Sequence, residues 1–171
     1  MSPASRTTYR VCFVCTGNIC RSPMAEAVFR ARVREAGLDA LVEVGSAGTG
    51  SWHLGEPADP RTAAVLEAAG YPLTHTARCF EPDWFARTDL VVALDEGHAA
   101  ELRALARNST EAAKVRLLRS YDPEADPAEM SVPDPYYGGE RGFAACLEMV
   151  EAAVPGLLCE VAAALGAREA G

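Results

Sequence analysis

Short apolar runs alternate with amphipathic stretches along this chain, and the alternation predicts strands and helices in turn. The run YRVCFVC is rich in β-branched and aromatic side chains, as expected of a buried strand. Met24, Ala27 and Val28 recur at helical spacing after Pro23, which suits a first helical turn. Strands are expected over 9–15, 41–48, 89–94 and 114–118, and helices over 23–36, 59–70, 96–106 and 141–165.

Strands that alternate with helices predict a parallel sheet, because right-handed crossovers place helices on both of its faces. We therefore expect an α/β fold in a single domain over residues 1–171, with a four-stranded parallel sheet and a flexible segment 1–8. In such folds ligands collect beyond the carboxyl ends of the strands. Cys15 ends the first strand, and residues 120–139 form a long loop rich in Pro, Asp and Gly. We expect the chemistry at these two places.

Composition and charge narrow the possible partners. The chain has 171 residues, 49% of them apolar, and a net charge of −8. An acidic chain gains little from nucleic acid or an anionic membrane, so neither is an expected partner. The opening ten residues lead only to VCFVC, which is too short for a signal-peptide core or a membrane span. Six cysteines in a chain of this length do not suggest a disulfide framework, so we expect a cytoplasmic protein with reduced thiols.

The residues VCTGNICRSP, 14–23, form a tight polar turn between the first strand and the first helix. Successive backbone N–H groups in such a turn can hold an anion, and the following helix directs its positive end to the same point. Arg21 adds a planar fork of donors that matches two phosphate oxygens. This field favours the thiolate of Cys15, to which Ser22 can donate a hydrogen bond. The turn predicts a nucleophile aimed at phosphorus, with no metal or other cofactor required.

Other interpretations of this turn are weaker. Cys12 and Cys15 form C-x-x-C, but residues three apart on a strand point to opposite faces, and no second pair completes a four-ligand zinc site. A lone buried cysteine is usually a small hydrophobic side chain. The turn also lacks the G-x-x-x-x-G-K-[ST] pattern of nucleotide-binding loops.

Cleavage of a phosphate ester also needs an acid that protonates the leaving oxygen. The long loop contains Asp-Pro steps at Asp122, Asp126 and Asp134, and each could simply start a turn, so turn chemistry does not separate them. Asp134 differs because Tyr136 and Tyr137 follow it and could form the walls of a slot for an aromatic leaving group.

The pattern C-x5-R-S, filled as CTGNICRSP, together with DPYYGG far downstream, resembles the low-molecular-weight protein tyrosine phosphatases over about residues 9–160. The resemblance implies a hydrolase of tyrosine-phosphorylated proteins. Cys15 would be its nucleophile, Arg21 its phosphate clamp and Asp134 the acid that later activates water. The other implied site residues are Thr16, Gly17, Asn18, Ile19, Cys20 and Ser22 of the loop, Ser46 and His75 behind it, and Trp52, Tyr136 and Tyr137 around the mouth.

Three other functions compete with this interpretation. Arsenate reductases use a similar C-x5-R loop, but they need relay cysteines near the end of the third strand, where DLVVALDEGHAA has none. Protein arginine phosphatases carry threonine where this chain has Ile19, whose apolar side chain leaves room for an aryl ester and offers no hydrogen bond to water. A phosphotyrosine-binding module would use neither a nucleophile nor an acid.

For the remaining histidines, Asp95 and the other cysteines we expect structural roles or, at Cys20, a redox role. His53 and His98 are expected at the surface, and Asp95 is expected to cap the helix after the third strand. Mild oxidation is expected to join Cys20 reversibly to Cys15, because both lie in the same loop. The cysteines expected only to pack are Cys79, Cys146 and Cys159.

Overall fold

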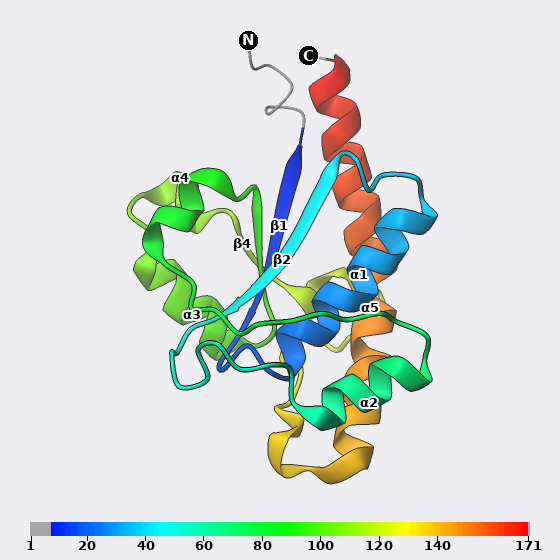
Figure 1. Cartoon of the computed structure of the whole chain (residues 1–171). Helices are drawn as coiled ribbons and strands as arrows, with labels where there is room; N and C mark the ends of the chain where they lie inside the picture. The colour runs from blue at the N-terminus through cyan, green and yellow to red at the C-terminus, as the bar shows by residue number, and fades with distance from the viewer. Residues whose placement is uncertain (1–7, 171) are drawn as a thin grey trace.

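The computed structural model describes residues 8–170, of which the side chains of 137 and 168–170 are not described. The segment 1–8, expected to be flexible, lies outside the described residues except for Thr8. Four parallel strands form one sheet in the order β2-β1-β3-β4, with helices on both faces (Figure 1), so the expected fold class is confirmed. The strands are β1 (Tyr9–Cys15), β2 (Val42–Gly48), β3 (Leu90–Ala93) and β4 (Val115–Leu117).

Five α-helices and three short 3-10 helices in the described chain surround the sheet. The α-helices are α1 (Arg21–Glu35), α2 (Pro60–Ala68), α3 (Glu96–Leu105), α4 (Ser109–Ala112) and α5 (Gly139–Ala170). The 3-10 helices are η2 (Pro82–Arg87), η3 (Leu118–Tyr121) and η4 (Pro135–Tyr137). The four helices expected from the sequence are present, although α1 begins two residues earlier and α5 extends further at both ends. The one-turn elements were missed because they are too short to show a period.

Alternate residues of β1 face the two sides of the sheet and belong to two separate cores. Phe13 and Cys15 pack on the side covered by α1 and α5, where the Phe13 ring meets Phe29 edge-on at 5.6 Å between centroids. Cys12 and Val14 belong to a smaller core beneath η2 and α3. The expectation that Cys12 and Cys15 point to opposite faces is therefore correct, so the two thiols of this C-x-x-C sequence do not act as a pair.

The long helix α5 closes one side of the larger core. Its length and apolar composition alone would also suit a membrane span. Here one side of it packs against α1 and η3, with buried Phe143, Val150, Val154, Leu157 and Val161 at helical spacing. Packing inside the molecule accounts for this apolar face.

Gly156 allows α5 to approach η3 closely. A Cβ atom at Gly156 would overlap the backbone carbonyl oxygen of Tyr121. A Cβ atom at Gly166 in the same helix would meet nothing within 4 Å. The two glycines belong to one helix but differ in what lies opposite them.

We expect Gly156→Ala to lower the free energy of unfolding by about 1–3 kcal/mol, because the backbone at Tyr121 must move. The matched control Gly166→Ala should raise it by up to about 1 kcal/mol, since alanine is the better helix former. Urea denaturation of both variants measures the difference. A Gly156→Ala protein as stable as the control would contradict this close packing.

Candidate active site

Residues 15–22 connect β1 to α1 beyond the carboxyl end of an inner strand of the sheet, and the carbonyl groups of this loop are bound from outside. The acceptors are the carbonyls of Cys15, Thr16, Asn18 and Ile19, and their donors are Thr49 N (2.8 Å), Gly50 N (3.0 Å), His75 Nε2 (2.6 Å) and Asp59 N (2.8 Å). In a trans peptide the C=O and N–H groups point in opposite directions. The N–H groups of the following residues therefore face the inside of the loop, namely those of Thr16, Gly17, Ile19 and Cys20. Together they form a concave surface for an anion.

Asn18 is the internal brace of this loop. Its backbone has a φ of 59°, a left-handed conformation that asparagine adopts more readily than most residues. Its Oδ1 accepts from Arg78 N at 2.8 Å, and its Nδ2 donates to Ser22 Oγ at 2.8 Å and to Ser46 Oγ at 2.9 Å. Ser46 in turn donates to Glu26 Oε1 at 2.6 Å. Because a backbone N–H can only donate, Arg78 fixes the orientation of the Asn18 amide.

The sulfur of Cys15 lies on the floor of the loop, where the residue is only 2% exposed. Ser22 approaches it twice, with Oγ at 3.0 Å and the backbone N–H at 3.4 Å. The Ser22 hydroxyl already accepts from Asn18, so its own proton can go to the sulfur or to the Ala47 carbonyl at 3.3 Å. A thiolate has no proton to donate, so the hydroxyl would donate to it. The Ser22 hydroxyl and backbone N–H are therefore both placed to donate to this sulfur.

Arg21, at the start of α1, is 3% exposed and is held from several elements. Its Nη1 donates to Asp95 Oδ2 and to the Val132 carbonyl, both at 2.9 Å. Its Nη2 lies 3.4 Å from Thr16 Oγ1 and 3.7 Å from Asp134 Oδ2. The guanidinium is therefore fixed beside Cys15, with little rotamer freedom left to lose when an anion binds.

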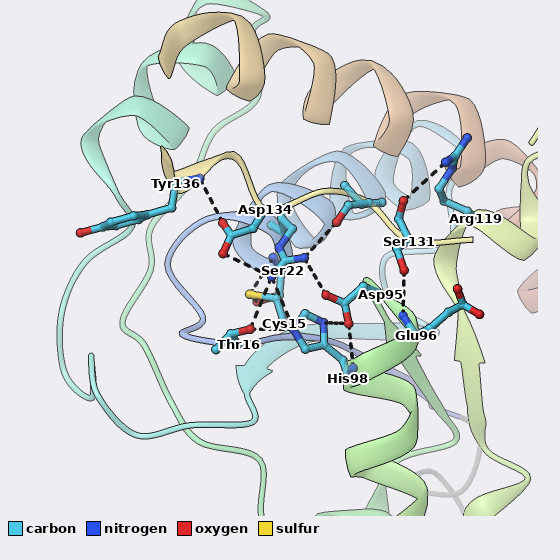
Figure 2. Close-up of polar contacts among 12 residues, drawn as sticks. Cys15, Thr16, Ser22, Asp95, Glu96, His98, Arg119, Ser131, Asp134 and Tyr136 are labelled. Atoms are coloured by element: carbon cyan, nitrogen blue, oxygen red, sulfur yellow. Dashed lines mark hydrogen bonds and ion pairs between the residues drawn. The ribbon is translucent and has the colours of Figure 1, made fainter. Parts of the chain in front are cut away.

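The structure separates the three Asp-Pro candidates. Asp122 and Asp126 each accept a backbone N–H two residues ahead, at 2.9 Å, and so act in local turns. Asp134 also accepts such a bond, from Tyr136 N at 3.0 Å, but its carboxylate lines the same cavity as Cys15. Figure 2 shows Asp134 lying on the opposite side of the Cys15 loop from His98.

A cavity of about 230 Å³ opens above Cys15. Trp52, His53 and Tyr136 form its outer wall, and Trp52 is 73% exposed. The side chain of Tyr137 lies outside the described residues, so only Tyr136 of the expected tyrosine pair can be placed. The other residues that line the cavity are Thr16, Gly17, Ile19, Cys20, Arg21 and Asp134.

Sequence reasoning missed Arg61, which ties η4 to α2. Its Nη1 donates to the Tyr136 carbonyl at 2.9 Å, and its guanidinium lies 5.1 Å from the centre of the Tyr136 ring. Asp59 holds Arg61 in place through both carboxylate oxygens, and these bonds keep the pKa of Asp59 below its usual value. Arg61 thereby fixes the segment that carries Asp134.

The expectation that His98 lies at the surface is wrong, because the residue is only 2% exposed. Its Nδ1 faces Asp95 Oδ1 at 3.2 Å, and its Nε2 lies 2.7 Å from Thr16 Oγ1 and 3.4 Å from Arg21 Nη2. A proton on Nδ1, opposite the carboxylate, leaves Nε2 free to accept from Thr16 and Arg21. Burial lowers the pKa of His98 to about 4; the Arg21 charge acts in the same direction, whereas Asp95 and Asp134 oppose it. The sequence signal that could have revealed this site was the position of His98 one turn after Asp95.

The remaining expectations are partly met. Asp95 caps α3, as expected, by accepting His98 N at 2.7 Å, and it also binds Arg21. His53 is partly exposed, in line with the expected surface position, and it also lines the cavity and bonds Glu56 at 3.0 Å. Burial raises the pKa of Cys20 to about 12, so this thiol stays protonated. Within residues 8–170, no cluster of His, Cys, Asp and Glu side chains has the geometry of a metal site.

An anion-binding loop around a buried thiol, with a carboxylic acid at the cavity mouth, is the arrangement of a cysteine-dependent phosphatase. The family model described as low molecular weight phosphotyrosine protein phosphatase matches residues 10–167. This chain is 69% identical to a low molecular weight protein-tyrosine-phosphatase of Streptomyces coelicolor, over 90% of this chain and 94% of that one. The chain belongs to this family of hydrolases.

Two solved structures extend the comparison. A protein tyrosine phosphatase from Entamoeba histolytica superposes with a TM-score of 0.86 at 32% identity, covering 92% of this chain and 99% of that one. A Drosophila arginine phosphatase superposes with a TM-score of 0.81 at 30% identity, covering 88% and 96%. The fold is therefore shared by enzymes that act on different phosphorylated side chains.

The environment of His98 predicts a pH dependence of stability. An unfolded histidine titrates near 6.5, so between about pH 6.5 and 4 the unfolded chain takes up a proton that native His98 does not. The free energy of unfolding should therefore decrease as the pH is lowered from about 6.5 to about 4, by roughly 2–4 kcal/mol in total. His98→Gln has nothing to titrate and should show a flatter profile in urea denaturation at pH 7, 5.5 and 4.5. Parallel profiles for the two proteins would contradict the buried neutral imidazole.

Proposed function

We propose that this chain hydrolyses phosphotyrosine in proteins, and small aryl phosphates, through a phosphocysteine intermediate. Cys15 is the nucleophile, Arg21 the phosphate clamp and Asp134 the general acid and base. The observation that supports the assignment best is that four inward N–H groups, Arg21 and the Cys15 sulfur share one cavity with the Asp134 carboxyl.

In the first step the Cys15 thiolate attacks phosphorus, the P–O bond to the phenol breaks, and Asp134 gives its proton to the departing oxygen. Negative charge is spread over the three other phosphoryl oxygens. The inward amides and the Arg21 guanidinium are positioned to bind these oxygens without reorganising, which lowers the barrier. The positive charge required is supplied by this chain, so the proposed reaction needs no metal.

In the second step Asp134, now a carboxylate, takes a proton from water as the water attacks the phosphocysteine. The P–S bond breaks, inorganic phosphate leaves, and Cys15 returns as a thiolate held by Ser22. The 3.7 Å separation of Asp134 Oδ2 from Arg21 Nη2 keeps the carboxylate near the phosphoryl site in both steps.

The cavity walls support an aromatic substrate. Trp52 and Tyr136 offer faces for a flat phenol ring, and the Ile19 side chain adds an apolar contact. Phosphoserine is shorter, so its phosphate would not reach the floor of the cavity. We propose that the substrates are tyrosine-phosphorylated proteins of the cytoplasm, where reducing conditions also keep Cys15 reactive.

Substitution of the two central residues tests the assignment. Cys15→Ser should abolish turnover of p-nitrophenyl phosphate. Asp134→Ala should lower kcat/KM, which reports the first step alone, by about 10²–10⁴-fold on phenyl phosphate, but less on p-nitrophenyl phosphate, whose leaving group needs little protonation. Exposed Asp126→Ala, from the same loop, is the matched control and should keep full activity. An equal loss on both substrates would exclude Asp134 as the acid.

Kinetic measurements on phosphorylated peptides distinguish a phosphotyrosine substrate from a phosphoarginine substrate. Wild-type protein should favour a phosphotyrosine peptide, and Ile19→Thr should shift the ratio of kcat/KM toward phosphoarginine, because threonine can hold the water that attacks a phosphoramidate. A wild-type preference for phosphoarginine would overturn the proposed substrate.

The loop also predicts a reversible response to peroxide. Oxidation of the Cys15 thiolate gives a sulfenic acid, and attack by the Cys20 sulfur then releases water and forms a disulfide. Mass spectrometry of peroxide-treated protein should detect this disulfide, and thiol reductants should restore activity. Cys20→Ser should instead accumulate sulfinic and sulfonic acid at Cys15. The same irreversible products in wild-type protein would exclude the protective disulfide.

A further inference from the structure

A second polar cavity, of about 280 Å³, lies on the face of the sheet covered by η2, beside the amino-terminal halves of β1 and β2. Its charged residues are Arg10 from β1, Arg78 and Arg87, and Trp84 of η2 and Glu43 of β2 also line it. We call these residues the arginine pocket. It belongs to the other side of the sheet from the Cys15 cavity, which opens at the carboxyl end of β1.

The arginine pocket carries uncompensated positive charge. Arg10 pairs with Glu43 at 3.0 Å, but neither Arg78 nor Arg87 makes an ion pair within the described residues. Both guanidinium groups are instead held at the same indole, 5.1 Å and 5.6 Å from the centre of the Trp84 ring. Two like charges close to one ring repel each other, and an anion between them would relieve that repulsion.

The space beside the guanidinium groups is accessible. Gly45 of β2 lacks the side chain that would otherwise crowd Arg78, since a Cβ there would lie 3.0 Å from its Nη2. Arg78 Nη2 donates to the Ser46 carbonyl at 3.2 Å, and no other described residue hydrogen-bonds this guanidinium, so the other edge of the planar fork is available to a ligand. Planar forks of this kind bind paired oxygens of phosphoryl groups in a bidentate manner.

We propose that the arginine pocket binds a small anion with adjacent phosphoryl groups, of the class of phosphorylated metabolites. Arg78 and Arg87 bind its oxygens, and Arg10 adds a third positive charge. The Glu43 carboxylate, which pairs with Arg10, repels part of the negative charge of the ligand. The volume suits a small molecule and not a folded partner.

Occupancy of the arginine pocket acts on the phosphatase loop through Arg78. The backbone N–H of this residue orients the Asn18 amide, and its guanidinium bonds the carbonyl of Ser46, which is the other neighbour of that amide. A ligand that draws the Arg78 side chain away from Ser46 therefore changes the support of the loop that holds Cys15.

The two tryptophans of the chain allow each cavity to be monitored separately, because Trp84 lies in the arginine pocket and Trp52 lies at the Cys15 cavity. In Trp52→Phe protein, titration with inorganic pyrophosphate at constant ionic strength should give a saturable change in Trp84 emission. Trp84→Phe protein reports pyrophosphate binding at the Cys15 cavity and so gives the affinity of the competing site.

Variants of the pocket then test the assignment in the Trp52→Phe background. Arg87→Gln should weaken pyrophosphate binding by about tenfold or more, since one charge-assisted contact is lost. Glu43→Gln should strengthen binding, because it removes the only carboxylate among the described residues that line the pocket. Exposed Arg34→Gln makes the same change in net charge on α1, which covers the other face of the sheet, and should have no effect. No saturable change, or equal weakening by Arg87→Gln and Arg34→Gln, would overturn the proposal.

Kinetics test the connection to the loop. Pyrophosphate competes at the Cys15 cavity in every variant and raises KM for p-nitrophenyl phosphate. In wild-type protein it should in addition change kcat, whereas in Arg87→Gln, which lies outside the catalytic machinery, kcat should stay constant. The same kcat response in both proteins, or none in either, would overturn the coupling through Arg78.

Discussion

The site depends on one constraint of the peptide bond: a carbonyl group that is held outward turns the next N–H inward. Four carbonyls of the loop after β1 are held by donors from three other segments, namely residues 49–50, Asp59 and His75. No donor of that set lies within the loop itself. The shape of the anion-binding surface is therefore imposed by the surrounding fold, and it is present before any substrate arrives, which is the condition for electrostatic stabilisation without reorganisation.

The direction of the hydrogen bonds behind the loop also fixes where the Ser22 proton can go. Arg78 N–H orients Asn18, and Asn18 then donates to Ser22, which leaves the Ser22 proton available to the Cys15 sulfur. The Arg78 N–H can only donate, so Asn18 must accept with its oxygen and donate with its nitrogen, and Ser22 must accept from Asn18. Arg78 also lines the arginine pocket. A ligand in that pocket would therefore contact the residue that orients Asn18.

Asp134, the proposed general acid, is held in place although it lies in a long loop. The backbone of that loop is attached at Val132, which donates to the Leu94 carbonyl at 2.8 Å and accepts from Arg21, while Arg61 holds Tyr136. Figure 2 shows a third attachment, in which Ser131 lies between Glu96 and Arg119. Because the chain is attached on both sides of Asp134, the proposed proton donor has a fixed position without belonging to a regular element.

The sequence by itself determined those features of this protein that depend on neighbouring residues in the chain. The periodicity of the apolar positions predicted four strands and four helices, and the spacing of Cys15, Ser22 and Arg21 predicted an anion-binding turn. Turn chemistry could not choose among three aspartates, and one-turn elements such as α4 left no period to detect. Only the tertiary structure brought Arg61, Arg78 and His98 to the site, because these residues lie 40 or more positions from Arg21 in the sequence. His98 shows the reason most clearly: its residue type is compatible with the surface, and its burial follows only from how α3 packs against the loop.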